Sequence, residues 1–327
     1  GGPARGGLRI GPRFQYLSGV PVALEPLYMR MGKPAPGDWL ANHDEPGQTL
    51  AQWCAMPPVL ARPPRRLLYL LPMGFADAAP PMRAILAATT EFLTAFFQLP
   101  VIMLPEVPAS LVPDAARRPH PVTRHLQLQT TYILNDIMVP RLPDDAAAML
   151  CLTAHDLFPR PGWNFVFGQA LLRKRVGVWS VYRNGDPGVE FGRVLWRTLK
   201  TAAHETCHMF SIRHCTAYEC LMSGANSDAE RERRPLEPCP VDTAKLLRAT
   251  CVMDPRPRYA QLLQFAIKYG FEREAALYRA SLAALEPVVT TALLAAAAGG
   301  GGGRGGGGGG MGVVVLPVGR LLGALGL

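Results

Sequence analysis

The sequence predicts an α/β fold, and three observations support this prediction. Two short apolar runs, at 67–71 and 101–104, flank a stretch at 81–98 whose apolar residues recur at helical spacing. Further runs with strand character follow in the middle of the chain. A second helical pattern, over 193–210, comes after these runs and ends in a cluster of histidines.

The first of these elements form a strand–helix–strand unit. The run at 67–71 lies between prolines and is short, as expected for a buried strand. The helix over 81–98 begins with Pro81, which suits a first turn, and Pro100 prevents its continuation. A strand, a crossover helix and a second strand in this order predict a parallel pair.

The middle of the chain contains more strand candidates. Residues 127–134 fit either a strand or the start of a helix, and the pattern leaves both open. The apolar runs at 146–153, 165–167 and 176–182 each predict a strand.

The composition predicts three regions along the chain. Residues 1–60 are rich in Gly and Pro, which indicates an irregular N-terminal extension wrapped around the main domain. That domain covers 61–285, and it ends in one or two helices over 259–285 that break near Gly270. The Ala-rich and then Gly-rich sequence of 286–327 cannot bury enough apolar surface to fold, so we expect a disordered tail.

Charge and hydropathy argue against nucleic acid and membranes as partners. The net charge is +9, but no basic stripe is interleaved with aromatic residues. No apolar run has the character of a transmembrane helix, and the start of the chain lacks the apolar segment of a secretory signal. We therefore expect a soluble, intracellular and cytoplasmic monomer. The first residue is Gly rather than Met, so the natural N-terminus can lie upstream.

The histidine cluster at 204–215 has the spacing of a zinc site. His204 and His208 are four residues apart, so on a helix both imidazoles project from one face and can bind one ion. Glu205 is placed to take a proton from a metal-activated water. His214 supplies a third ligand only if the helix ends within about two residues of His208 and the chain turns back.

Cysteines crowd the same region. Because the chain shows no export signal, four cysteines within 33 residues indicate metal binding rather than disulfides. They are Cys207, Cys215, Cys220 and Cys239. Cys207 would point away from the metal-binding face of the helix, so we expect it to be a packed core residue.

The segment from His204 to Cys239 resembles the archaemetzincin family, whose pattern is HExxHxxGxxHC, then x4-C-x-M, a spacer and CxxC. The resemblance implies a zincin or metzincin-like fold with a mixed β-sheet, an active-site helix and a small C-terminal subdomain. It also implies a catalytic zinc on three histidines and a second, structural zinc on four cysteines, with Met222 in the methionine turn beneath the catalytic metal.

Two positions depart from the family pattern. Ser211 stands where the family has Gly, a residue that adopts a left-handed backbone there, and a non-Gly residue costs about 1 kcal/mol in that conformation. Asp242 stands where the final Cys of CxxC belongs. A carboxylate can bind zinc, so Asp242 is a possible fourth ligand beside Cys215, Cys220 and Cys239. Two alternatives remain open: Cys251 completes the site, or no second metal binds.

The resemblance implies a zinc metallopeptidase, a hydrolase of short peptides with aminopeptidase-like preference, in which Glu205 is the general base. The strand at 176–182 would form a sheet edge to which a peptide can pair, or else be an ordinary sheet strand. Tyr218 is a candidate for assisting the oxyanion. The alternatives are a catalytically inactive zinc-binding relative that acts as a binding module, and a structural zinc domain that binds nucleic acid through its basic surface.

The remaining histidines receive no catalytic role. His155 and Asp156 are neighbours in a loop, where a turn or capping role is expected. His43, His120 and His125 have no partners at useful spacing and stay unassigned.

Overall fold

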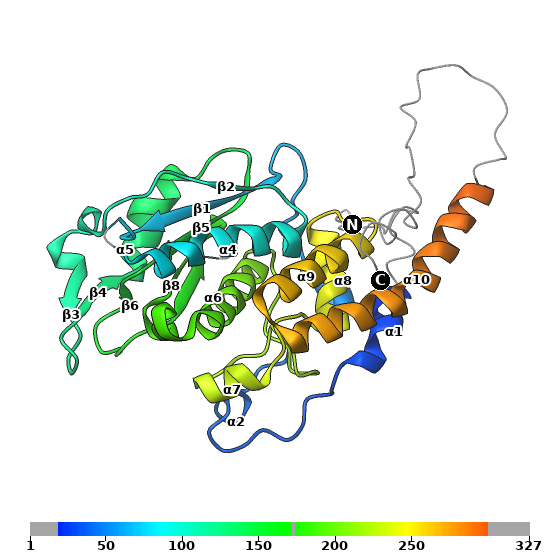
Figure 1. Cartoon of the computed structure of the whole chain (residues 1–327), viewed down its shortest axis with the longest axis horizontal. Coiled ribbons are helices and arrows are strands. Elements are labelled where there is room, and N and C mark those ends of the chain that lie inside the picture. The colour runs from blue at the N-terminus through cyan, green and yellow to red at the C-terminus, as the bar shows by residue number, and fades with distance from the viewer. Residues whose placement is uncertain (1–18, 77, 172–173, 300–327) are drawn as a thin grey trace, which may run out of the picture. The chain divides into compact units, whose positions relative to one another are not determined.

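The computed structural model describes residues 19–76, 78–171 and 174–299 (Figure 1). The described residues up to Thr290 form one compact unit. It is an α/β structure, as the sequence predicts, with a central sheet and helices packed on it.

The central sheet has the strand order β2-β1-β5-β8-β7. Its strands are β1 (Leu67–Met73), β2 (Val101–Met103), β5 (Ala146–Thr153), β7 (Gly168–Leu171) and β8 (Val176–Ser180). β1 pairs parallel with both β2 and β5, and β5 pairs parallel with β8, whereas β7 runs antiparallel to β8. The predicted parallel pair and the predicted mixed sheet are therefore both confirmed.

The structure decides between the two readings of the run at 176–182 and corrects one other strand prediction. The run is an ordinary sheet strand rather than an edge, because β8 lies between β5 and β7, and β7 is the edge strand on that side. The run at 165–167 is not a full strand: Val166 makes one isolated bridge to Leu157, and β7 begins only at Gly168. Register within a sheet depends on distant partners, which local periodicity does not report.

A smaller sheet, in the order β3-β4-β6, lies beside the central one. Its strands are β3 (Arg117–Pro119), β4 (Leu126–Gln129) and β6 (Asp156–Phe158). The ambiguous segment 127–134 takes both of its predicted forms in succession: β4 is followed by the helical segments α5 (Thr130–Tyr132) and η5 (Ile133–Met138).

Two long helices cover one face of the central sheet, α4 (Pro80–Phe97) and α6 (Pro187–Met209), and they lie side by side (Figure 1). β1 shows how the sheet separates two hydrophobic cores. Leu68 and Leu70 point into the core that contains α4 and α6, whereas Leu71 and Met73 point into a second core with η5. Alternate residues of a strand face opposite sides of a sheet, so this one apolar strand serves both cores.

The segment after α6 folds into the helices α7 (Asp228–Arg233), α8 (Pro240–Ala249), α9 (Arg256–Tyr269) and α10 (Glu272–Gly299). The last three contribute apolar residues to the α4–α6 core. The predicted break near residue 270 is confirmed, because Gly270 ends α9 with a left-handed backbone (φ +71°). None of the helices in the described ranges combines the length and apolar character needed to cross a membrane.

Both ends of the chain contain more regular structure than the composition suggests. The expected N-terminal extension includes three short helices between its irregular links, α1 (Gly19–Leu24), α2 (Trp39–Asn42) and α3 (Leu50–Ala55). α10 continues beyond 285, and Val289 is buried, so the folded chain extends past the expected start of the tail at 286. Residues 1–18 and 300–327 lie outside the described residues.

Candidate metal centre

The active-site helix ends where the histidine spacing requires. α6 ends at Met209, and Ser211 has φ +68°, the left-handed conformation expected at the family's Gly position. The backbone N–H of Ser211 donates to the carbonyl of His208 at 2.8 Å, and that of Ile212 donates to the carbonyl of Cys207 at 3.2 Å. These bonds close the helix and turn the chain back, which brings His214 toward the helix.

The three predicted histidines converge. Suitable ligand atoms of His204, His208 and His214 all lie within 4.8 Å of one another. The Nε2 atoms of His204 and His208 are 3.0 Å apart. Two nitrogens bound to one tetrahedral zinc are about 3.4 Å apart, so a small adjustment would let both bind one ion.

Each histidine uses its other nitrogen, Nδ1, for a hydrogen bond. His204 Nδ1 donates to the carbonyl of Leu221 at 2.9 Å, and His208 Nδ1 donates to the carbonyl of Ile212 at 2.7 Å. His214 Nδ1 lies 2.9 and 3.0 Å from the two carboxylate oxygens of Glu45. Carbonyls and carboxylates only accept hydrogen bonds, so Nδ1 carries a proton in each ring, and a neutral ring held in this way keeps a free lone pair on Nε2.

The protonation state favours a cation at this point. Burial lowers the pKa of His204 well below its usual value, and burial lowers the pKa of His208 to about 4. Both imidazoles are therefore neutral near pH 7, with two nitrogen lone pairs facing each other at 3.0 Å. A metal ion between them would replace this repulsion by two bonds, so the donor set fits zinc.

Glu205 is half-buried next to the first histidine. Burial raises the pKa of its carboxyl to about 7. No group in the described part of the chain forms a hydrogen bond with this carboxylate, so it is free to accept a proton from a bound water.

The predicted second metal group also assembles. Cys215, Cys220, Cys239 and Asp242 are buried, and one ligand atom from each lies within 4.8 Å of the others. The sulfurs of Cys215 and Cys239 are 3.7 Å apart, and Asp242 Oδ2 lies 3.4 Å from the sulfurs of both Cys220 and Cys239. The backbone N–H groups of Met222 and Cys239 point at Cys220 Sγ at 3.3 and 3.0 Å, which stabilises a thiolate.

Asp242, and not Cys251, occupies the fourth position. Cys251 is only half-buried and does not belong to the group. The other oxygen of Asp242, Oδ1, accepts a 2.7 Å hydrogen bond from Lys245 Nζ. Burial raises the pKa of Asp242 to about 6, with Lys245 acting in the opposite direction. Oδ2 is therefore the oxygen available to a metal, and the donor set of three sulfurs and one carboxylate oxygen suits zinc.

The other residues that the sequence singled out lie as follows. Cys207 is fully buried in the α4–α6 core, consistent with the packed role. Met222 is fully buried, and its carbonyl accepts from the N–H of Cys215 at 2.9 Å. It follows Leu221, whose carbonyl holds His204, so this segment contacts both metal groups. The hydroxyl of Tyr218, the candidate for assisting the oxyanion, donates a hydrogen bond to Glu25 at 3.1 Å. In this structure it is therefore already engaged.

Asp156 has a larger role than a loop cap. Its carboxylate is fully buried and accepts from the guanidinium of Arg183 and from Gln127 and His125, each at 2.7 Å. His125, which the sequence left without a partner, therefore has one. The contact forms because β4, which follows His125, pairs with β6, and so His125 reaches Asp156 across 31 residues; no local pattern in the sequence predicts that pairing.

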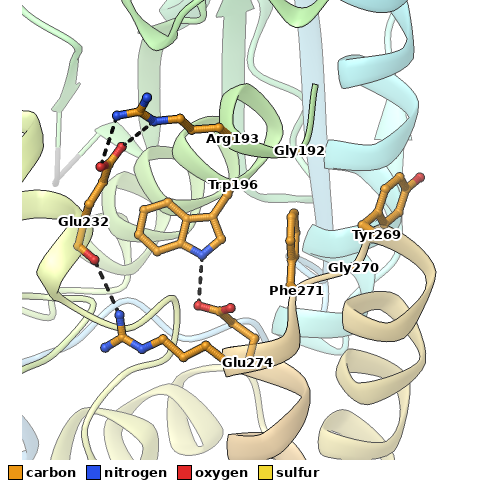
Figure 2. Close-up of a pocket in the computed structure, with 9 residues that line it drawn as sticks. Gly192, Arg193, Trp196, Glu232, Tyr269, Gly270, Phe271 and Glu274 are labelled. Atoms are coloured by element: carbon orange, nitrogen blue, oxygen red, sulfur yellow. Dashed lines mark hydrogen bonds and ion pairs between the residues drawn. The ribbon is translucent and has the colours of Figure 1, made fainter. Parts of the chain in front are cut away.

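The described surface includes two hollows that differ in their lining. One, of about 930 Å³, lies at the histidines and is lined by Glu45, Pro46, Gly47, Met56, Pro57, Val59, His208, Ser211, Ile212, Arg213 and His214. The other, of about 460 Å³, lies between α6, α7 and the α9–α10 turn. Figure 2 shows Trp196 in it, donating its indole N–H to Glu274, with the ion pair of Arg193 and Glu232 above. It shares no lining residue with the first hollow and contains no histidine or cysteine.

Known proteins resemble the chain over most of this region. A scan against protein-family models found no match. Human archaemetzincin-2 is 32% identical over 247 residues, which cover 65% of this chain and 67% of the relative. Among solved structures, archaemetzincin from Methanopyrus kandleri is 29% identical, with a TM-score of 0.46, over 57% of this chain and 97% of the other. A zinc-dependent peptidase from Methanocorpusculum labreanum is 20% identical, with a TM-score of 0.43, over 55% and 99%.

Proposed function

The chain belongs to the archaemetzincin family, and on this premise we propose that it is a zinc-dependent peptidase that hydrolyses short peptides with Glu205 as general base. One observation carries the proposal. Three imidazoles converge, each with Nδ1 in a hydrogen bond, and Glu205, the next residue after the first of them, has a carboxylate without a hydrogen-bond partner in the described structure.

In the proposed hydrolysis, the metal ligands and Glu205 have different roles. When bound, zinc would polarise the scissile carbonyl and lower the pKa of the attacking water toward about 7. Glu205 takes a proton from that water as it attacks the carbonyl carbon, and then delivers the proton to the leaving amine. A raised pKa suits this exchange, because the carboxyl can both accept and release a proton near neutral pH.

The hollow at the histidines supports a short substrate. Its volume, about 930 Å³, is in the range of pockets that enclose small ligands. Its lining includes the apolar Met56, Pro57 and Val59 and the polar Glu45, His208, Arg213 and His214. A peptide of a few residues fits such a space better than a folded protein does. A folded protein would need a long open cleft.

The group of three cysteines and Asp242 supports a second, structural zinc as part of the same proposal. The chain around it has little regular structure between α6 and α8, apart from the short helix α7. A metal held by four buried ligands would fix this segment, which supplies both His214 and the carbonyl that orients His204.

Hydrolysis of a peptide library by zinc-loaded protein tests the proposal. We expect cleavage of short peptides, loss of cleavage after removal of metal by a chelator, and recovery on addition of zinc. Stoichiometric zinc at the histidines with no cleavage of any peptide would favour the inactive binding module instead. Peptide substrates, a monomeric state and the absence of nucleic acid as a partner remain predictions.

A further inference from the structure

A segment from the expected N-terminal extension lies against the turn that carries the third histidine. We name residues 45–59 the N-terminal strap. It runs through α3 and lines the hollow at the histidines, opposite residues 211–214. More than 150 residues of sequence separate the strap from this turn.

The strap forms hydrogen bonds to the turn along most of its length. Trp53 Nε1 donates to the carbonyl of Phe210 at 3.1 Å. Gln48 donates to the carbonyl of Ser211 and accepts from the N–H of Arg213, both at 3.2 Å. The N–H of Val59 donates to Ser211 Oγ at 3.2 Å. These bonds satisfy the polar groups of a turn that Ser211 forms without the usual Gly.

The strap is itself held in place. A capping box starts α3: Thr49 Oγ1 accepts from the N–H of Gln52, and Gln52 Oε1 accepts from the N–H of Thr49. The carbonyl of Gln48 accepts a 2.5 Å hydrogen bond from Lys245, the same ammonium that pairs with Asp242. Lys245 therefore connects the strap to the second metal group.

Glu45 is the strap residue that reaches a predicted metal ligand. Its carboxylate lies 2.9 and 3.0 Å from His214 Nδ1, and the two side chains are only 26% and 21% exposed. Nδ1 and Nε2 lie on opposite sides of the imidazole ring, so Glu45 is on the side away from the ion. A carboxylate here fixes the ring, selects the tautomer with a free Nε2, and increases the electron density on that nitrogen.

We infer that Glu45 is a positioning residue of the catalytic metal centre, and that the N-terminal strap belongs to that centre. The inference rests on the proposed zinc site at the three histidines. His204 and His208 are held by backbone carbonyls close to them in the fold, whereas His214 depends on a side chain from the far end of the chain. Glu45 therefore controls how strongly the third ligand binds.

Three full-length variants test this role, with zinc affinity as the main readout. Glu45→Ala removes the acceptor, Glu45→Gln keeps an amide oxygen that still accepts from Nδ1, and Asp44→Ala removes the same charge one residue away. Asp44 is exposed, and no hydrogen bond connects it to the turn in the described structure, so it is a matched control. Zinc affinity is measured by competition with a chelator of known affinity, and thiolate–cobalt absorption reports the cysteine group separately.

We expect Glu45→Ala to weaken zinc binding at the histidines about 10- to 100-fold. Glu45→Gln should recover part of this loss, and Asp44→Ala should stay within about twofold of the wild type, since surface charge acts weakly at that distance. The metal-free variants should unfold at the same urea midpoint. Cobalt-loaded Glu45→Gln should keep the visible spectrum of the wild type, because Glu45 is not a ligand.

Wild-type affinity in Glu45→Ala would overturn the inference, and so would an equal loss in Asp44→Ala, which would indicate a general charge effect. A changed cobalt spectrum in Glu45→Gln would show Glu45 to be a ligand rather than a positioning residue. If the wild type itself bound no zinc at the histidines, the proposed function would fail first, and the inference with it.

Discussion

Lys245 and Asp242 form an ion pair of 2.7 Å in the interior, where both side chains are almost completely buried. The pair leaves one oxygen of Asp242 facing the sulfurs of Cys220 and Cys239. A buried carboxylate needs such a partner, because an unpaired charge in the interior is strongly destabilising. The family position for Cys can therefore be occupied by Asp in this chain, whose fold supplies a lysine beside it.

Replacement of Asp242 by Asn should remove one zinc per chain. The amide keeps an oxygen for Lys245 but is a much poorer zinc ligand than a carboxylate. We expect metal analysis to give two zinc ions for the wild type and one for Asp242→Asn, with peptidase activity reduced but present. His214→Ala should also lose one zinc, from the other site. Two zinc ions in Asp242→Asn would contradict the assignment of the fourth ligand.

Glu205→Gln should keep its zinc and lose peptide hydrolysis. The amide has the same shape but cannot accept a proton, so we expect kcat to fall by about 10²- to 10⁴-fold. Metal analysis and initial rates on one short peptide measure the two effects. Glu190→Gln, which changes a partly exposed carboxylate near the start of the same helix, serves as control and should keep wild-type activity. Full activity in Glu205→Gln would exclude the general-base role.

Ser211 should tolerate Gly better than Ala. With φ +68°, Gly removes the strain of the left-handed backbone but also loses the bond to the N–H of Val59 and gains freedom in the unfolded chain. These effects nearly cancel, so Ser211→Gly should change the free energy of unfolding by less than about 1 kcal/mol. Ser211→Ala keeps the strain and loses the bond, for a cost of about 1 kcal/mol or more. Urea unfolding of both variants checks the order, and the reverse order would be inconsistent with this account.

Asp156 should make stability sensitive to acid. Burial alone would raise the pKa of its carboxyl, but hydrogen bonds from Arg183, His125 and Gln127 outweigh burial and hold the pKa below the usual 3.8. A carboxyl with a lowered pKa in the folded state stabilises above its unfolded pKa, and this contribution is lost as pH falls through the folded value. Asp156→Asn should cost about 3 kcal/mol at pH 7.

The difference between Asp156→Asn and the wild type should then shrink below about pH 4. Urea unfolding of the metal-free proteins at pH 7 and pH 3 measures it without interference from zinc loss. A difference that stays constant over this range would show that Asp156 does not act through its charge.

Much of the fold and of the site follows from short-range patterns. The break at Gly270, the end of α6 and the pairing of β1 with β2 all depend on residues close together in sequence. Spacing alone also brought His204, His208 and His214 into one group. The order of strands in the sheet could not be predicted in this way. The position of β8 depends on its pairing with β5 and β7, and the spacing of apolar residues within a strand does not show which strands lie beside it.

A partner from a distant segment was missed for the same reason. Glu45 meets His214 across 169 residues, and no local pattern marks this contact, since an isolated Glu in a Pro-rich stretch is usually a solvated surface residue. The pair of Lys245 with Asp242 is different: the two residues are three apart on α8, so helical spacing could have indicated it.

Because the N-terminal strap contacts the turn at 210–214, the three histidines are expected to be oriented at different stages of folding. A ribosome delivers Glu45 long before His214, and closing a loop of 169 residues costs more entropy than closing the short turn between His208 and His214. The two helical histidines can meet as soon as α6 forms, but the third ligand is oriented only after the chain has closed on itself. A chain that lacked residues 45–59 would therefore orient its third histidine poorly, even with all three histidines present.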